Sequence, residues 1–154
     1  MAVIEHRAAV LGSPIAHSLS PVLHSAGYAA AGLDGWEYER IECSAEQLPD
    51  IVGNADESYR GFSVTMPGKF AALAFADEVT DRARTIGSAN TLVREFRGGS
   101  TFWRADNTDC EGIFGALNEL VGPEKKLGHV LLIGSGGTAR PALWALVQRG
   151  VDKV

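Results

Sequence analysis

Short apolar runs alternate with helix-forming segments along this chain, and a glycine or proline turn separates almost every pair. The chain holds 18 glycines in 154 residues, against a usual share of about 7%. This alternation predicts an α/β fold with an open, mostly parallel sheet flanked by helices. We expect strands over 7–12, 36–42, 61–65 and 129–133, and a hairpin of 88–95 with 101–105. We expect helices over 20–32 with Ser20 as N-cap, 44–53 behind a capping box, 69–76, 108–121 and 138–149.

Charge and composition argue against several classes of protein. A net charge of −5 disfavours nucleic acid or an anionic membrane as the main partner. Two cysteines, Cys43 and Cys110, cannot form a disulfide framework, and we expect no metal site because no metal-ligand spacing is present. Residues 8–33 carry no acidic or basic side chain, but Pro14 and Pro21 interrupt them, so we expect no membrane span. With no targeting signal visible, we expect a cytoplasmic protein.

A glycine-rich turn follows the apolar run 130–133 and opens the last predicted helix. It reads Gly134-Ser-Gly136-Gly-Thr-Ala139 and satisfies the dinucleotide-binding pattern G-x-G-x-x-G/A. Gly134 would permit the tight turn, and Gly136 would let a pyrophosphate approach the backbone. The alternative is an ordinary glycine turn. The residue that separates NADP from NAD lies about 20 positions further on, where the sequence ends at Val154.

Two further motifs carry polar groups to strand ends. Ser18 and Ser20 lie at the mouth of the first predicted helix, where two hydroxyls and helix N–H groups suit a carboxylate, although Ser20 alone is explained by capping. Lys69 follows the run Gly61 to Gly68 and is the only lysine before Lys125. Lysine can exchange a proton when desolvated, so Lys69 is a candidate acid–base residue; the alternative is an ordinary solvated lysine.

Amide and carboxylate side chains gather at two later turns. Asn90 lies in Ile86-Gly-Ser-Ala-Asn-Thr91, and Asp109 ends Ala105-Asp-Asn-Thr-Asp109. Both could hold the hydroxyls of a polyol. The alternative for Asp109 is a plain turn or N-cap residue, and that is how we interpret Asn107 and Thr108.

Taken in order, five motifs resemble those of the shikimate dehydrogenases, enzymes of aromatic amino-acid biosynthesis. They read G-S-P-I-A-H-S-L-S-P, G-F-S-V-T-M-P-G-K, I-G-S-A-N-T, D-N-T-D-C-E-G and I-G-S-G-G-T-A-R. The resemblance implies an NADP-dependent oxidoreductase that reduces 3-dehydroshikimate to shikimate, with a small molecule as its partner. It also implies an amino-acid-dehydrogenase-like substrate domain followed by an incomplete Rossmann-type unit.

The same resemblance implies a role for each matching residue. Lys69 and Asp109 would form the catalytic pair, and Asn90 with Asp109 would hold the ring hydroxyls. The substrate carboxylate would bind to Ser18, Ser20 and Thr65. The NADP pyrophosphate would bind to Gly134, Gly136, Gly137, Thr138 and Ala139. Ser63 stands where the family usually has asparagine, which puts one side-chain hydrogen bond near the site in question.

The motif order also predicts how the chain is divided. We expect a substrate-binding catalytic domain over 1–121 and the beginning of a dinucleotide-binding domain over 122–154. One βα unit cannot complete a Rossmann sheet, so we expect either low activity of this chain alone or self-association as a homo-oligomer. Two alternatives stay open at this point: a quinate/shikimate dehydrogenase that uses NAD, and a substrate domain that binds without catalysis.

Overall fold

A six-stranded mixed sheet organises residues 3–154, the part of the chain that the computed structural model describes. The strand order is β2-β1-β3-β5-β6-β4. The strands are β1 (His6–Gly12), β2 (Trp36–Glu42), β3 (Tyr59–Val64), β4 (Glu78–Val79), β5 (Thr91–Arg97) and β6 (Ser100–Asp106). The helices are α1 (Ser20–Ala30), α2 (Leu48–Gly53), α3 (Lys69–Phe75), α4 (Asp81–Ile86), α5 (Asp109–Val121) and α6 (Ala139–Gln148). The α/β class predicted from the sequence is confirmed.

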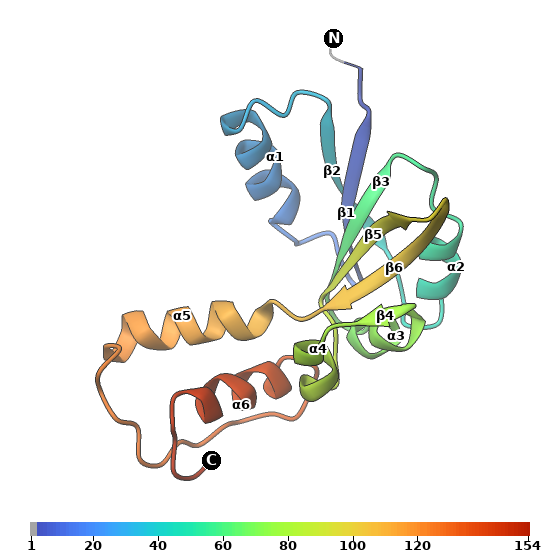
Figure 1. The fold of residues 1–154 in the computed structure, drawn as a ribbon. Helices are drawn as coiled ribbons and strands as arrows, with labels where there is room; N and C mark the ends of the chain where they lie inside the picture. Colours follow the sequence, from blue (N-terminus) through green and yellow to red (C-terminus); the bar gives the residue numbers. More distant parts are fainter. Residues whose placement is uncertain (1–2) are drawn as a thin grey trace.

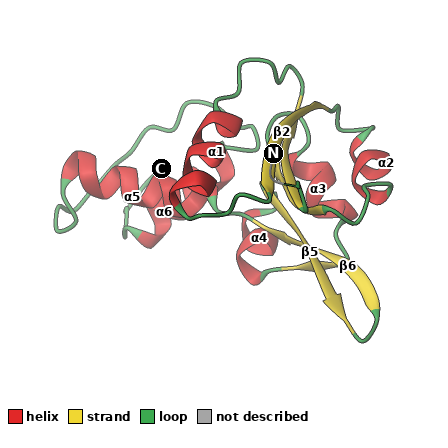
Figure 2. Cartoon of the chain, turned by 90° about the horizontal axis from the view of Figure 1, so that it is seen from above, coloured by secondary structure: helices red, strands yellow, loops and turns green. Residues whose placement is uncertain are grey.

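Helices cover both faces of the sheet. Figures 1 and 2 show α1 on one side of the strands and α2 and α3 on the other. Helices α5 and α6 pack against each other beyond the end of the sheet. The larger core cluster lies between the sheet and α2 and α3 and includes Leu11, Leu48, Phe62, Leu92 and Trp103, all nearly or fully buried.

The pairing pattern brings several chain turns to one edge of the sheet. Strand β1 pairs in parallel with β2 and β3, so the carboxyl ends of these three strands lie together. Strand β5 runs antiparallel to β3 and begins at that edge, because Thr91 pairs with Ser63. Strand β6 returns to it, because Asp106 pairs with Thr91. The segments after β1, β3 and β6 and before β5 therefore meet at one place.

Most predicted elements are present, and one helix was missed. The strand over 36–42 and the hairpin are confirmed. The reciprocal hydrogen bonds of the predicted capping box are present, because the backbone N–H of Ser44 donates to Gln47 Oε1 at 3.0 Å and that of Gln47 donates to Ser44 Oγ at 3.4 Å, but α2 itself begins only at Leu48. Helix α4 was not predicted, although Thr80 accepts a hydrogen bond from the Ala83 N–H at 3.2 Å, a capping signal that the sequence contains.

Two local predictions are wrong. Ser20 is the first residue of α1 and makes no side-chain cap; its N–H instead donates to Ser18 Oγ at 3.3 Å. The strand over 129–133 is not formed, since His129 makes only an isolated bridge to Lys153. A strand needs a partner along its length, and within residues 3–154 the backbone of 130–133 has only one such contact, from the Val130 N–H to the Lys153 carbonyl at 2.9 Å. The sheet is mixed: the pairings of β1 with β2, β1 with β3 and β4 with β6 are parallel, so most of the sheet is parallel as predicted, and the pairings of β3 with β5 and β5 with β6 are antiparallel.

No helix within residues 3–154 is both long and apolar enough to cross a membrane.

The buried core cluster leads to a prediction about stability that is independent of the polar residues at the sheet edge. Leu92→Ala should lower the free energy of unfolding by about 2–5 kcal/mol, because the 0% exposed side chain leaves a cavity in the core. Leu120→Ala is the matched control: this leucine of α5 is 81% exposed, and the same change should stay within about 0.5 kcal/mol. Urea denaturation followed by circular dichroism measures both. Equal losses for the two variants would contradict the assigned core.

Candidate functional site

The turns after β1 and β3 are tied together by backbone hydrogen bonds. The Ser13 N–H donates to the Met66 carbonyl at 3.0 Å, and the Thr65 N–H donates to the Leu11 carbonyl at 2.8 Å. Thr65 is half-buried at this junction. The two motifs were identified independently in the sequence. They are neighbours in the structure because the strands that precede them pair in parallel.

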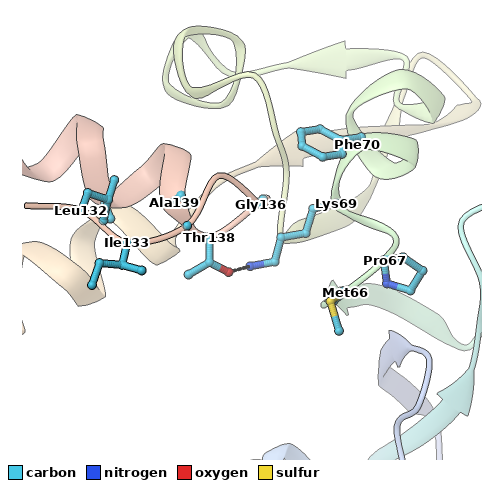
Figure 3. A pocket seen from close by; sticks show the side chains of 12 residues that line it. Met66, Pro67, Lys69, Phe70, Leu132, Ile133, Gly136, Thr138 and Ala139 are labelled. Atoms are coloured by element: carbon cyan, nitrogen blue, oxygen red, sulfur yellow. Dashed lines mark hydrogen bonds between the residues drawn. The ribbon is translucent and has the colours of Figure 1, made fainter.

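Lys69 is the first residue of α3 and is buried, with only 9% of its surface exposed. Its ammonium forms an ion pair with Asp109 Oδ2. It also donates to Thr138 Oγ1 at 3.2 Å, the contact drawn in Figure 3. The alternative of a solvated lysine is therefore wrong. A buried ammonium needs a counter-charge, and the Asp109 carboxylate supplies it.

Asn90 holds the second oxygen of the same carboxylate. Its Nδ2 donates to Asp109 Oδ1 at 2.8 Å and to Thr108 Oγ1 at 3.0 Å, while its Oδ1 accepts from the Thr108 N–H at 2.9 Å. Asp109 also begins α5, and the helix dipole favours a carboxylate in the first turn. The structure thus brings three predicted site residues into one hydrogen-bonded cluster: Lys69, Asp109 and Asn90.

A neighbouring ion pair supports this cluster and was not predicted from the sequence. Arg82 of α4 donates to Asp106 at 2.6 Å and 3.1 Å, and Thr80 donates to the same carboxylate at 2.7 Å. Burial by itself would raise the pKa of Asp106, but the hydrogen bonds from Arg82 and Thr80 hold that pKa below its ordinary value. Asp106 is the last residue of β6 and stands three residues before Asp109. Because α4 was not predicted, no signal in the sequence indicated that Arg82 lies beside Asp106.

Asn107, interpreted from the sequence as a plain turn residue, lies in the interior of the structure. It is 0% exposed, and its Nδ2 donates to the carbonyl of Ser88 at 2.9 Å and to Ser88 Oγ at 3.2 Å. Ser88, also fully buried, donates in turn to the carbonyl of Gly137 at 3.3 Å. This chain of contacts connects the D-N-T-D motif to the glycine-rich turn.

The glycine-rich turn forms one wall of a cavity of about 630 Å³ beside Lys69. Met66, Pro67 and Phe70 line the opposite wall (Figure 3). Gly134 has a φ of +119°, which side-chain-bearing residues rarely adopt.

The residues around this cavity fit a dinucleotide. Beside Gly136 no heavy atom other than its chain neighbours lies within 4 Å of where a Cβ would stand, so the backbone is open to a ligand. The five residues predicted for the pyrophosphate lie in this turn or at the start of α6: Gly134, Gly136, Gly137, Thr138 and Ala139. Within residues 3–154, no group of three metal-ligating side chains is present.

The two predicted serines are not joined to this cluster. Ser18 Oγ accepts from the Ser20 N–H, and the Ser18 carbonyl accepts from Arg40 Nε at 2.8 Å. Across residues 3–154 neither hydroxyl forms a hydrogen bond to Lys69 or Asp109. Both follow the carboxyl end of β1 and so share its edge of the sheet, where their role as a carboxylate site stays a prediction.

Ser63 has a partner of its own. Its Oγ accepts a hydrogen bond from the hydroxyl of Tyr38 at 2.8 Å, and the Tyr38 ring stacks on His24 of α1 with centroids 4.0 Å apart. Burial raises the pKa of the Tyr38 hydroxyl, so it stays a donor. The serine therefore ties β3 to β2 and α1.

Comparison with known proteins gives consistent results. The family model described as the shikimate dehydrogenase substrate binding domain matches residues 10–92. A shikimate dehydrogenase (NADP(+)) of Methylobacterium radiotolerans is 43% identical over 100% of this chain and 55% of its own length. A pentafunctional AROM polypeptide of Mycosarcoma maydis is 40% identical over 96% of this chain and 9% of its own length.

Solved structures agree with the sequence relatives. The crystal structure of Mycobacterium tuberculosis shikimate dehydrogenase has a TM-score of 0.82 and 56% identity, over 95% of this chain and 52% of that protein. The Thermus thermophilus enzyme in complex with NADP(H) and shikimate has a TM-score of 0.81 and 36% identity, over 96% and 54%. The chain spans about half the length of the shikimate dehydrogenases that it matches.

The Asp106–Arg82 pair makes stability depend on pH. The folded pKa of Asp106 lies below its unfolded value of about 3.9. The carboxylate therefore contributes stability above that pH, and the contribution is lost as the pH falls through the folded pKa. Asp106→Asn should lower the free energy of unfolding at pH 7 by about 1–3 kcal/mol. The difference from the unmodified chain should shrink below about pH 4.

Denaturant titrations from pH 3 to pH 8 measure this effect. Asp34→Asn is the control, because Asp34 is exposed and takes part in no ion pair within residues 3–154. An Asp106→Asn difference that stays constant over the whole pH range would contradict the prediction.

Proposed function

The chain belongs to the family of shikimate dehydrogenase substrate-binding domains, and on that premise we propose that it binds shikimate and 3-dehydroshikimate and provides the catalytic pair for their interconversion. The observation that carries this proposal is the buried Lys69–Asp109 ion pair, with Asn90 on the second carboxylate oxygen. An ammonium, a carboxylate and an amide at one sheet edge offer both donors and acceptors to a polyol. The relatives named as shikimate dehydrogenases support the same substrate.

Binding follows from the chemistry of these groups. Asp109 accepts hydrogen bonds and Asn90 both donates and accepts, so together they can hold two neighbouring hydroxyls. The hydroxyls of Ser18, Ser20 and Thr65 would bind the carboxylate group at the adjoining turns. Of the five side chains that would bind the substrate, only that of Asp109 carries a charge. The ammonium of Lys69 balances this charge, so the site is close to neutral overall.

NADP is the cofactor that we propose, and the turn from Gly134 to Ala139 would hold its pyrophosphate. When bound, the reduced nicotinamide supplies a hydride to the ketone carbon of 3-dehydroshikimate. The cavity between this turn and Met66, Pro67 and Phe70 adjoins Lys69. Several finer statements stay predictions: NADP rather than NAD, a cytoplasmic location, self-association and the boundary at residue 121.

The role of Lys69 is to stabilise negative charge on the substrate oxygen and to protonate it. As the ketone is reduced, negative charge develops on that oxygen, and the Lys69 ammonium stabilises it and donates a proton from Nζ. Asp109 keeps Nζ in place through the ion pair. In the reverse direction Nζ accepts the proton of the alcohol.

Substrate binding can be tested without any cofactor. Isothermal titration of shikimate into the chain should give a saturable heat, and Asn90→Ala should weaken the affinity about tenfold, since a hydrogen-bond partner of the ligand and of Asp109 is lost. The control is Asn54→Ala, because the exposed Asn54 side chain donates, among the described residues 3–154, only to the Asp50 carbonyl. If titration of shikimate gave no heat, the proposal would be overturned. If quinate bound more tightly than shikimate, quinate would be assigned as the substrate instead.

Turnover tests the catalytic pair. In an NADPH-oxidation assay with 3-dehydroshikimate, Lys69→Ala should lower kcat by about 10²–10⁴-fold, the usual contribution of a positioned acid or base. The affinity for substrate should change much less. Lys126→Ala, at an exposed lysine, should leave kcat unaltered. An unchanged kcat for Lys69→Ala would remove this residue from the chemistry.

A further inference from the structure

One hydroxyl of the glycine-rich turn reaches the ammonium of Lys69. Thr138 Oγ1 accepts a hydrogen bond from Lys69 Nζ at 3.2 Å, and Figure 3 shows the two side chains directed toward each other across the cavity wall. The Thr138 side chain does not cap α6, so capping does not account for its position. The function proposed above makes no use of this contact.

Close packing brings the turn onto the lysine stem. A Cβ on Gly137 would lie 3.3 Å from Lys69 Cδ and 3.4 Å from Lys69 Cβ, which is tighter than ordinary contact. A side chain at this position would require the lysine stem to shift by a few tenths of an ångström, so the backbone beside Thr138 rests closely against Lys69. The carbonyl of Gly137 is fixed on its other side by the buried hydroxyl of Ser88, at 3.3 Å.

A second anchor lies two residues beyond Thr138. Arg140 Nη1 donates to the Gly87 carbonyl at 3.2 Å, and its guanidinium lies 4.8 Å from the centre of the Phe70 ring. Phe70 is the chain neighbour of Lys69. The turn is thus held on both sides of Thr138, and these anchors determine where the hydroxyl lies.

We propose that Thr138 is a positioning residue for Lys69. An ammonium has three N–H donors, of which Asp109 accepts one and Thr138 a second. With both in place, the third donor is left for a substrate oxygen in a single direction. The inference rests on the proposed function only in naming Lys69 as the reacting group; the contact itself does not depend on that function.

The test measures the reactivity of each lysine and needs neither substrate nor cofactor. The chain has only four lysines, and Lys125, Lys126 and Lys153 are exposed, so they serve as internal references. Acylation with N-hydroxysuccinimidyl acetate, followed by peptide mass spectrometry, gives a rate for each lysine. Thr138→Val, which removes the hydroxyl at nearly constant shape, should raise the Lys69 rate about threefold or more relative to the references.

Three further variants make the outcome decisive. Thr138→Ser keeps a hydroxyl and should restore the slow Lys69 rate, whereas Thr138→Ala should behave as Thr138→Val does and replaces it if the valine variant fails to fold. Ser135→Ala removes a hydroxyl from the same turn that makes no hydrogen bond within residues 3–154, and it should leave the rate unchanged.

The proposal is overturned if Thr138→Val or its alanine substitute leaves the Lys69 rate as in the unmodified chain. It is also overturned if Ser135→Ala raises the rate equally, because the effect would then be a general loosening of the turn. A failure of shikimate to bind in the calorimetric experiment would leave these rates untouched, so the two proposals fail separately.

Discussion

The burial of one ammonium group is the constraint on which the site depends. Lys69 retains 9% of its exposure, and a charge in that position is costly unless it is paired and hydrogen-bonded. Asp109 provides the pairing from the first turn of α5, forty positions along the chain. The sheet must therefore bring the end of β3 and the end of β6 together, and the order β3-β5-β6 does so.

The contacts around this pair each join two segments of the chain that are distant in the sequence. Asn90 joins the start of β5 to Asp109, while Arg82 joins α4 to the end of β6. Ser88 and Asn107 connect these segments to the glycine-rich turn through fully buried groups. The result is a polar cluster whose members come from strand ends, helix starts and the loop between α4 and β5, and hydrogen bonds hold these segments together.

Three of the candidate residues named from the sequence lie together in one hydrogen-bonded cluster of the structure. Lys69, Asn90 and Asp109 were singled out because polar side chains at strand ends and turns are typical of ligand sites in α/β proteins. The glycine-rich turn was found from its spacing alone, and the structure places it beside Lys69. Arg82 was missed because α4 was missed, and the burial of Asn107 was missed because burial depends on segments far away in the chain.

Secondary structure and capping depend largely on short stretches of residues, so the sequence by itself determined the class of fold, the capping box at 44–47 and the hairpin, whereas the pairing of Lys69 with Asp109 was implied only by the family resemblance. Pairing between segments that are far apart in the chain cannot be inferred from short stretches of sequence. Tertiary structure alone decided that Ser20 starts its helix without capping it, and that residues 130–133 form no strand, because a strand exists only with a partner. It also decided that Thr138 and Asp109 share one ammonium, since a hydrogen bond requires two groups within about 3 Å of each other, whatever their separation along the chain.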